Sequence, residues 1–170
     1  MLHSAGEYRG TVRIAADTSE LPTVNGARVA VVQSKWYRDQ VDRMADACRV
    51  TLRAAGCVEP TTHIVPGALE MPLAVTLLLR SDPTLDAVIC LGAVMKGDTY
   101  HFEMVVDACG RGLAEVAREY LTPVINEVLP ITDLADLDKR SQPDGFNKGV
   151  EAAAAAVEFI AWRRALPAAP

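Results

Sequence analysis

Four short apolar runs, each of strand length and each followed by a helical pattern, constrain the fold more than any other feature of this sequence. The first run, RVAVVQ, is rich in valine and has an entirely apolar centre. Such a run is typical of a strand that is buried on both faces, as in a parallel sheet covered by helices. The predicted strands span residues 28–33, 61–66, 86–92 and 122–130.

Helical patterns lie between and after these runs. Residues 38–55 place apolar side chains at i, i+3 and i+4, which is one face of a helix, and Gly56 suits its C-terminal end. Pro72 falls in the first turn of the next helix, where proline is tolerated. The predicted helices span residues 38–55, 68–80, 102–120, 133–139 and 147–166, and the alanine run of the last one has high helix propensity.

This alternation predicts a three-layer α/β/α fold, with a four-stranded parallel sheet, helices on both faces and right-handed crossovers. Residues 28–166 form a single domain, preceded by a polar arm at 1–27 and followed by a tail at 167–170. Within the arm, residues 11–15 are a candidate for a short strand. An ordered arm needs a surface to pack on, and a neighbouring subunit would provide one.

Composition argues against several classes of protein. A formal net charge of −5 disfavours a nucleic-acid-binding protein, which usually presents a basic face. The four cysteines form no CxxC pair and no zinc spacing, so we expect buried thiols in a reducing compartment and no metal site. The apolar stretches are too short for a membrane span, and the first residues lack the pattern of a signal peptide. We therefore expect a soluble cytoplasmic protein.

The unusual residues of the chain gather after the strands, where ligands bind in parallel sheets. Gly97-Asp98-Thr99 joins the third strand to a helix, whose unpaired N-terminal amides suit a phosphate. Alternatively, Asp98 or Thr99 caps the helix without a ligand, and the local sequence by itself favours that interpretation. The chain contains neither GxGxxG nor GxxxxGK[ST], so it lacks the ordinary nucleotide-binding motifs.

Five further side chains near the strand ends each allow two interpretations. His101 is a proton shuttle or a surface or capping residue, and Trp36 stacks on a flat heterocycle or anchors the core or an interface. Glu70 accepts hydrogen bonds from a polyol or complements a helix dipole. Arg140 and Lys148 bind phosphate or are solvated charges. Together they indicate a site for a small molecule with a planar ring and a phosphate.

The chain also resembles the lumazine synthase family from about Arg28 to Trp162, in the order and spacing of four motifs: VPGALEMP (65–72), LGAVMKGDTYHFEMV (91–105), TPVINEVL (122–129) and NKGVEAAAAAVE (147–158). The resemblance implies condensation of 5-amino-6-ribitylaminouracil with 3,4-dihydroxy-2-butanone 4-phosphate. The products are 6,7-dimethyl-8-ribityllumazine, phosphate and water, and no metal or organic cofactor is needed. It also implies an arm that adds to a neighbour's sheet, sites between the subunits of a pentamer and, in some members, a hollow shell of 60 subunits.

The resemblance assigns roles to residues of this chain by matching position. His101 matches the proton-transfer residue. The pyrimidine and ribityl chain would be bound by Trp36, Ala68, Leu69, Glu70, Ala93, Val94, Met95 and Asn126. The phosphate would be bound by Gly97, Asp98, Thr99, Arg140 and Lys148.

The sequence departs from the family's pattern at a few of these places. Lys96 stands where arginine is usual, Leu69 where an aromatic residue is common and Glu127 where glycine is common, and residues 130–132 also differ. Two other functions therefore stay open: a lumazine- or flavin-binding or shell-forming homologue with altered chemistry, and a flavodoxin-like binding domain. The intact phosphate-side set, which includes His101 and Arg140, favours the enzyme.

Overall fold

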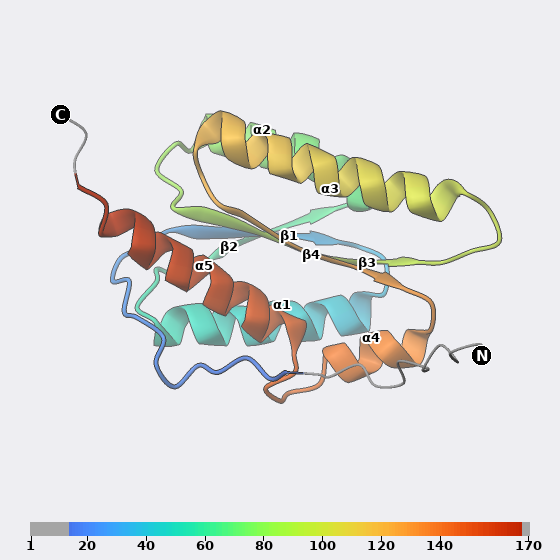
Figure 1. Cartoon of the computed structure of the whole chain (residues 1–170), viewed down its shortest axis with the longest axis horizontal. Coiled ribbons are helices and arrows are strands. Elements are labelled where there is room, and N and C mark those ends of the chain that lie inside the picture. The colour runs from blue at the N-terminus through green and yellow to red at the C-terminus, as the bar shows by residue number, and fades with distance from the viewer. Residues whose placement is uncertain (1–13, 168–170) are drawn as a thin grey trace, which may run out of the picture.

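The computed structural model describes residues 14–167 and has a four-stranded parallel sheet at its centre (Figure 1). The strands are β1 (Val29–Ser34), β2 (Thr61–Val65), β3 (Ala87–Met95) and β4 (Val124–Ile131), paired in the order β2-β1-β3-β4. All of β1 and most of β3 are buried. Burial on both faces explains why these two central strands are continuous apolar runs rather than alternating ones.

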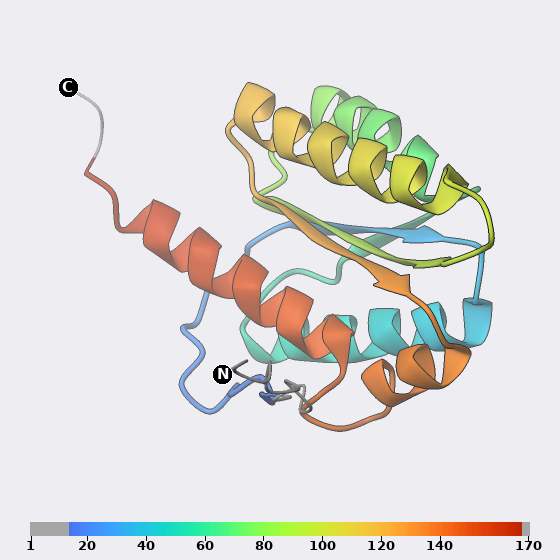
Figure 2. The ribbon, with the colours of Figure 1, turned by 45° about the vertical axis from the view of Figure 1, so that its right-hand side comes forward.

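Helices cover both faces of the sheet, which confirms the predicted three-layer α/β fold (Figure 2). One face carries α1 (Arg38–Ala54), α4 (Leu134–Arg140) and α5 (Lys148–Arg164). The other face carries a single 3-10 turn, η1 (Ala68–Glu70), together with α2 (Met71–Ser81) and α3 (His101–Tyr120). Successive strand residues alternate between the two layers, so Val31 packs on the α1 and α5 side and Val32 on the α2 and α3 side.

The turn residues behave as their chemistry predicts. Gly56 follows α1 with a φ of +88°, a left-handed conformation that glycine adopts without steric cost. Pro72 lies in the first turn of α2, where its missing N–H removes no helix hydrogen bond. The predicted helix at 133–139 is α4, and Asp133 caps it by accepting a hydrogen bond from the Ala135 N–H at 2.9 Å.

Helices α1 and α5 pack closely because a glycine stands at their contact. A Cβ placed on Gly149 would overlap the carbonyl group of Met44 and lie 2.6 Å from its carbonyl carbon. The alanine run of α5 has a fully buried side, made by Ala152, Ala153 and Ala156. The run therefore serves as a packing face and also has high helix propensity. This contact fixes the start of α5 and hence the position of Lys148.

The predicted N-terminal arm is only partly described. Residues 11–13 of the candidate strand lie outside the described residues, and residues 14 and 15 are not in a strand. The described part packs on its own chain, where the Ala16 N–H donates to the Gly145 carbonyl at 2.9 Å. Addition of the arm to a neighbouring sheet stays a prediction. Between residues 14 and 167, no helix combines the length and apolar character needed to cross a membrane.

Candidate active site

A cavity of about 360 Å³ opens at the carboxyl ends of the strands, where sheets of this kind bind their ligands. The segments after β1 and β2, the end of β3 and the start of α3 supply its walls. Its lining residues are Trp36, Tyr37, Gly67, Ala68, Leu69, Glu70, Ala93, Val94, Met95, Gly97, Thr99, His101, Phe102 and Val105. Most of the predicted site residues therefore meet in one cavity, although they come from distant parts of the chain.

Trp36 and Glu70 form one side of this cavity. A Cβ placed on Gly67 would lie 3.2 Å from Oε2 of Glu70 and 3.7 Å from Nε1 of Trp36, so both side chains border this glycine. The Trp36 indole is 60% exposed, and the Lys35 ammonium lies 5.4 Å from its ring centre. The site thus presents an open aromatic face beside an exposed carboxylate, which suits a planar ring that carries hydroxyl groups.

The turn before α3 is not occupied by a capping side chain. The N-cap residue of α3 is Tyr100, and among residues 14–167 no side chain hydrogen-bonds to the amides of the first turn. The interpretation in which Asp98 or Thr99 caps the helix is therefore wrong. Gly97 and Thr99 line the cavity, and a Cβ on Gly97 would meet no atom within 4 Å. The helix start can therefore offer its amides and partial positive charge to an anion.

His101 is the first residue of α3, one position earlier than the predicted helix start. It lines the cavity and is exposed to solvent, so its ring can exchange protons with a ligand and with water. The capping alternative is wrong for His101 as well, because α3 has no side-chain cap. Lys96, which ion-pairs with Glu103 at 3.5 Å, adds a cationic group near this end of the helix.

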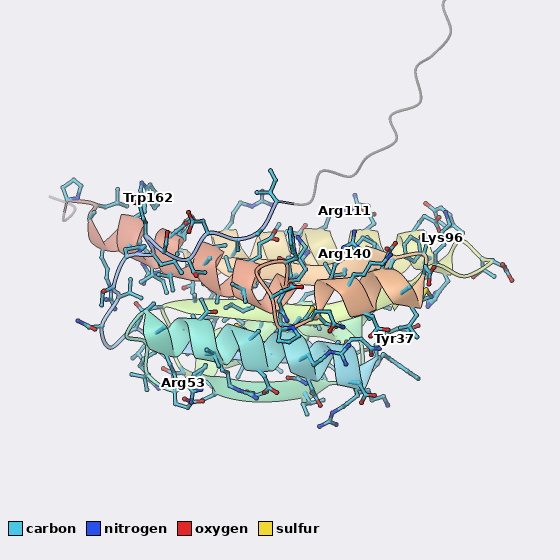
Figure 3. The ribbon with its side chains drawn as sticks, turned by 90° about the horizontal axis from the view of Figure 1, so that it is seen from below. Tyr37, Arg53, Lys96, Arg111, Arg140 and Trp162 are labelled. Carbon is cyan, nitrogen blue, oxygen red and sulfur yellow. The ribbon has the colours of Figure 1, made fainter. Side chains whose placement is uncertain are left out.

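Four predicted site residues, Asp98, Asn126, Arg140 and Lys148, do not line the cavity of their own chain. Asp98 is exposed in the turn, and Asn126 is exposed on the edge strand β4. Figure 3 shows Tyr37 and Lys96 at the same end of the molecule and Arg140 set back along α4. The predicted site residues therefore divide into a cavity group and an outlying group.

Arg140 ends α4 and is held by its own helix. Its Nη1 donates to the Asp136 carbonyl at 3.1 Å and lies 3.7 Å from Oδ1 of the same residue. The side chain is half-buried, with 28% of its surface exposed. A guanidinium fork can bind a phosphate in bidentate fashion.

Lys148 lies between two carboxylates. Its ammonium is 2.6 Å from Oε2 of Glu151 and 3.8 Å from Oε1 of Glu127. Glu127 is only 14% exposed, and burial raises its pKa from 4.5 to about 7. Lys148 opposes this rise and Glu151 adds to it, but loss of hydration is the largest cause. Glu127 therefore changes its charge near neutral pH.

We predict that Glu127 makes folding stability fall as the pH rises. A carboxyl group whose pKa is raised in the folded state contributes most below its unfolded pKa of 4.5, and the contribution is lost as the pH passes about 7. Glu127→Gln should therefore have a free energy of unfolding about 3 kcal/mol higher than that of wild type near pH 8, and nearly equal to it near pH 4. Urea titrations at both pH values measure this difference, and a difference independent of pH would contradict it.

Four lining residues were not among the predicted site residues: Tyr37, Gly67, Phe102 and Val105. Tyr37 has a φ of 54°, a left-handed conformation that tyrosine seldom adopts. Nothing in its residue type signals this conformation. Phe102 and Val105 follow His101 on α3, and the helical spacing 101, 102 and 105 could have identified them as neighbours on one face.

The cysteines are shielded from solvent and keep their protons. All four cysteines are buried and free, as predicted, and burial raises the pKa of Cys48 to about 12. Within residues 14–167, no group of three or more His, Cys, Asp and Glu side chains has the arrangement of a metal site.

Comparison with known proteins identifies the family. Residues 26–164 match the 6,7-dimethyl-8-ribityllumazine synthase family. The protein of that name from Mycolicibacterium vanbaalenii is 41% identical over 156 residues, which cover 89% of this chain and 98% of that protein. Its namesake from Xanthobacter autotrophicus is 37% identical over 158 residues, covering 91% and 95%. The chain belongs to the 6,7-dimethyl-8-ribityllumazine synthase family.

Proposed function

We propose that this chain condenses 5-amino-6-ribitylaminouracil with 3,4-dihydroxy-2-butanone 4-phosphate to 6,7-dimethyl-8-ribityllumazine, with release of phosphate and water, in riboflavin biosynthesis. The observation that carries the proposal is the cavity itself. It brings the Trp36 indole, the Glu70 carboxylate, the uncapped start of α3 and His101 together at one edge of the sheet. Each of these groups matches one part of the two substrates.

The cavity groups divide the two substrates between them. Trp36 stacks on the pyrimidine ring, and Glu70 accepts hydrogen bonds from the ribityl hydroxyls. The backbone of Ala93, Val94 and Met95 pairs with the ring edge, while Ala68 and Leu69 contact the ribityl chain. The segment from Gly97 to Thr99 holds the phosphate at the helix start.

The reaction needs positioning and proton transfer. The aromatic amine attacks the ketone and forms an imine with loss of water. The adjacent hydroxyl-bearing carbon then loses a proton while phosphate leaves from the terminal carbon, and the resulting enol takes up a proton on that terminal carbon and becomes a ketone. The second amino group closes the ring by attack on the new carbonyl carbon, and a second water leaves. His101 moves protons to and from the nitrogen and oxygen atoms in these steps. Holding both substrates side by side supplies much of the acceleration.

The outlying residues indicate that the complete site needs a second copy of the chain. Arg140, Lys148 and Asn126 carry groups for phosphate and ring binding but lie outside the cavity of their own chain. In a cyclic homo-oligomer, a heterologous interface brings the outlying group of one copy to the cavity of the next. We propose a pentamer with shared sites. Assembly of pentamers into a 60-subunit shell and a cytoplasmic location stay predictions.

An absorbance assay with both substrates tests the proposed function. The protein should form the lumazine chromophore well above the uncatalysed rate in buffer, with one phosphate released for each product. Formation at the background rate by a folded oligomer would contradict the proposal and would support the binding or shell-forming alternative. Glu127, the charged departure next to Lys148, would then be the first residue to examine.

We predict a moderate effect for His101→Ala. Removal of the proton shuttle should lower kcat by about 10²-fold or less, because water can reach the exposed position and replace the imidazole. The KM for each substrate should change little, and added imidazole should restore part of the rate. Circular dichroism serves as the control, since loss of the fold would instead give His101 a structural role.

A further inference from the structure

The cluster of Glu127, Lys148 and Glu151 holds two carboxylates against one ammonium at the junction of β4 and α5. Lys148 and Glu151 lie one turn apart on α5, and Glu151 is 47% exposed, so solvent screens this pair. Glu127 differs because only 14% of its side chain is exposed. A partly buried charge 3.8 Å from the Lys148 ammonium is screened less than an exposed one.

The strand pattern explains why Glu127 is largely shielded from solvent. Its neighbours on the same face of β4, Ile125 and Leu129, pack against the core cluster beneath α1 and α5. Its register partner on β3 is Leu91, which is fully buried and apolar. The charged groups that act on the pKa of Glu127 are Lys148 and Glu151, both from α5. Nothing in the strand favours a carboxylate at this position.

We propose that Glu127 is a positioning residue that controls the availability of Lys148 to an anionic ligand. With Glu127 ionised, the ammonium is drawn to the β4–α5 junction and two carboxylates repel an incoming phosphate. With Glu127 protonated, only the exposed Glu151 competes for Lys148. The affinity of the site for phosphate therefore increases when Glu127 takes up a proton. This inference rests on the proposed function, because that function makes Lys148 a phosphate ligand.

Binding of inorganic phosphate to the intact oligomer tests the inference without turnover. We compare wild type with Glu127→Gln by calorimetry near pH 6 and near pH 8, in buffers free of other phosphates. Glu127→Gln should bind phosphate about 3- to 10-fold more tightly than wild type near pH 8, and equally near pH 6. Phosphate titrates in this range too, but comparing the two proteins at one pH cancels that effect.

A double-variant cycle shows whether the effect passes through Lys148. In a Lys148→Gln background, the Glu127→Gln substitution should no longer change phosphate affinity near pH 8. An equal ratio of affinities at both pH values, or an effect that persists without Lys148, would overturn the inference. A purely structural role for Glu127 would change stability without the pH-dependent difference in binding.

The lumazine assay separates failure of this inference from failure of the proposed function. Absence of turnover in wild type would contradict the function while the phosphate comparison still reports on Glu127. Normal turnover with no pH-dependent difference between wild type and Glu127→Gln would contradict only the role given to Glu127.

Discussion

Replacing Arg140 by alanine should raise the KM for the butanone phosphate about 10- to 100-fold, because charge-assisted hydrogen bonds to phosphate are lost. The KM for the pyrimidine substrate should change much less, since the aromatic and carboxylate groups proposed to bind it belong to the cavity. Turnover at saturation should stay within a few-fold of wild type, because the contact serves binding rather than a chemical step. Initial rates at varied concentrations of each substrate measure these constants.

Arg111→Ala is the matched control for this experiment. Arg111 is a strongly exposed arginine on α3 that ion-pairs with Asp107 within its own helix and does not line the cavity. Figure 3 places Arg111 and Arg140 on different helices, so the control removes an equal charge at a different position. Its kinetic constants should match those of wild type. An unchanged KM in Arg140→Ala, or equal shifts in both variants, would remove Arg140 from the site.

Replacing Gly149 by alanine should lower the free energy of unfolding by more than about 3 kcal/mol, because the new methyl group meets a backbone atom. The added Cβ would overlap the carbonyl group of Met44, which is part of α1 and cannot rotate away as a flexible side chain would. α1 and α5 must then separate, and the buried alanine face of α5 loses its packing. Urea unfolding followed by circular dichroism measures the loss.

Gly110→Ala makes the same chemical change but should stabilise the protein, in contrast to Gly149→Ala. Gly110 lies inside α3, and a Cβ there would meet only Nδ2 of Asn126, at 3.8 Å. Alanine should therefore stabilise this helix by about 0.5 to 1 kcal/mol through its higher propensity. A Gly149→Ala variant as stable as wild type would show that α1 and α5 do not pack as closely as described.

The sheet and helices could be predicted because burial on both faces leaves a clear mark on the sequence. β1 and β3 read as continuous apolar runs, and Gly56 and Pro72 stand where their backbone geometry is useful. The start of α3 was harder to predict, because Asp98 and Thr99 are good capping residues by type. The chain instead places Tyr100 at the N-cap and leaves the first turn without a side-chain cap.

The parts of the site that sequence patterns missed depend on contacts between distant segments. Tyr37 lines the cavity through a left-handed turn that its residue type does not predict. The raised pKa of Glu127 arises mainly from burial. Lys148 and Glu151, which also act on it, belong to α5, whereas Glu127 belongs to β4. Arg140 and Lys148 were assigned by matching position, and neither lines the cavity of its own chain.

Subunit complementation tests most directly the central claim that two copies share each site. One chain carries Trp36→Ala and Glu70→Ala in the cavity, and the other carries Arg140→Ala in the outlying group. Each oligomer alone should have a strongly reduced kcat/KM. Oligomers assembled from an equal mixture should regain wild-type kcat/KM at about one quarter of their interfaces, where an intact cavity meets an intact Arg140. A mixture with only the average activity of its two parents would contradict the shared site.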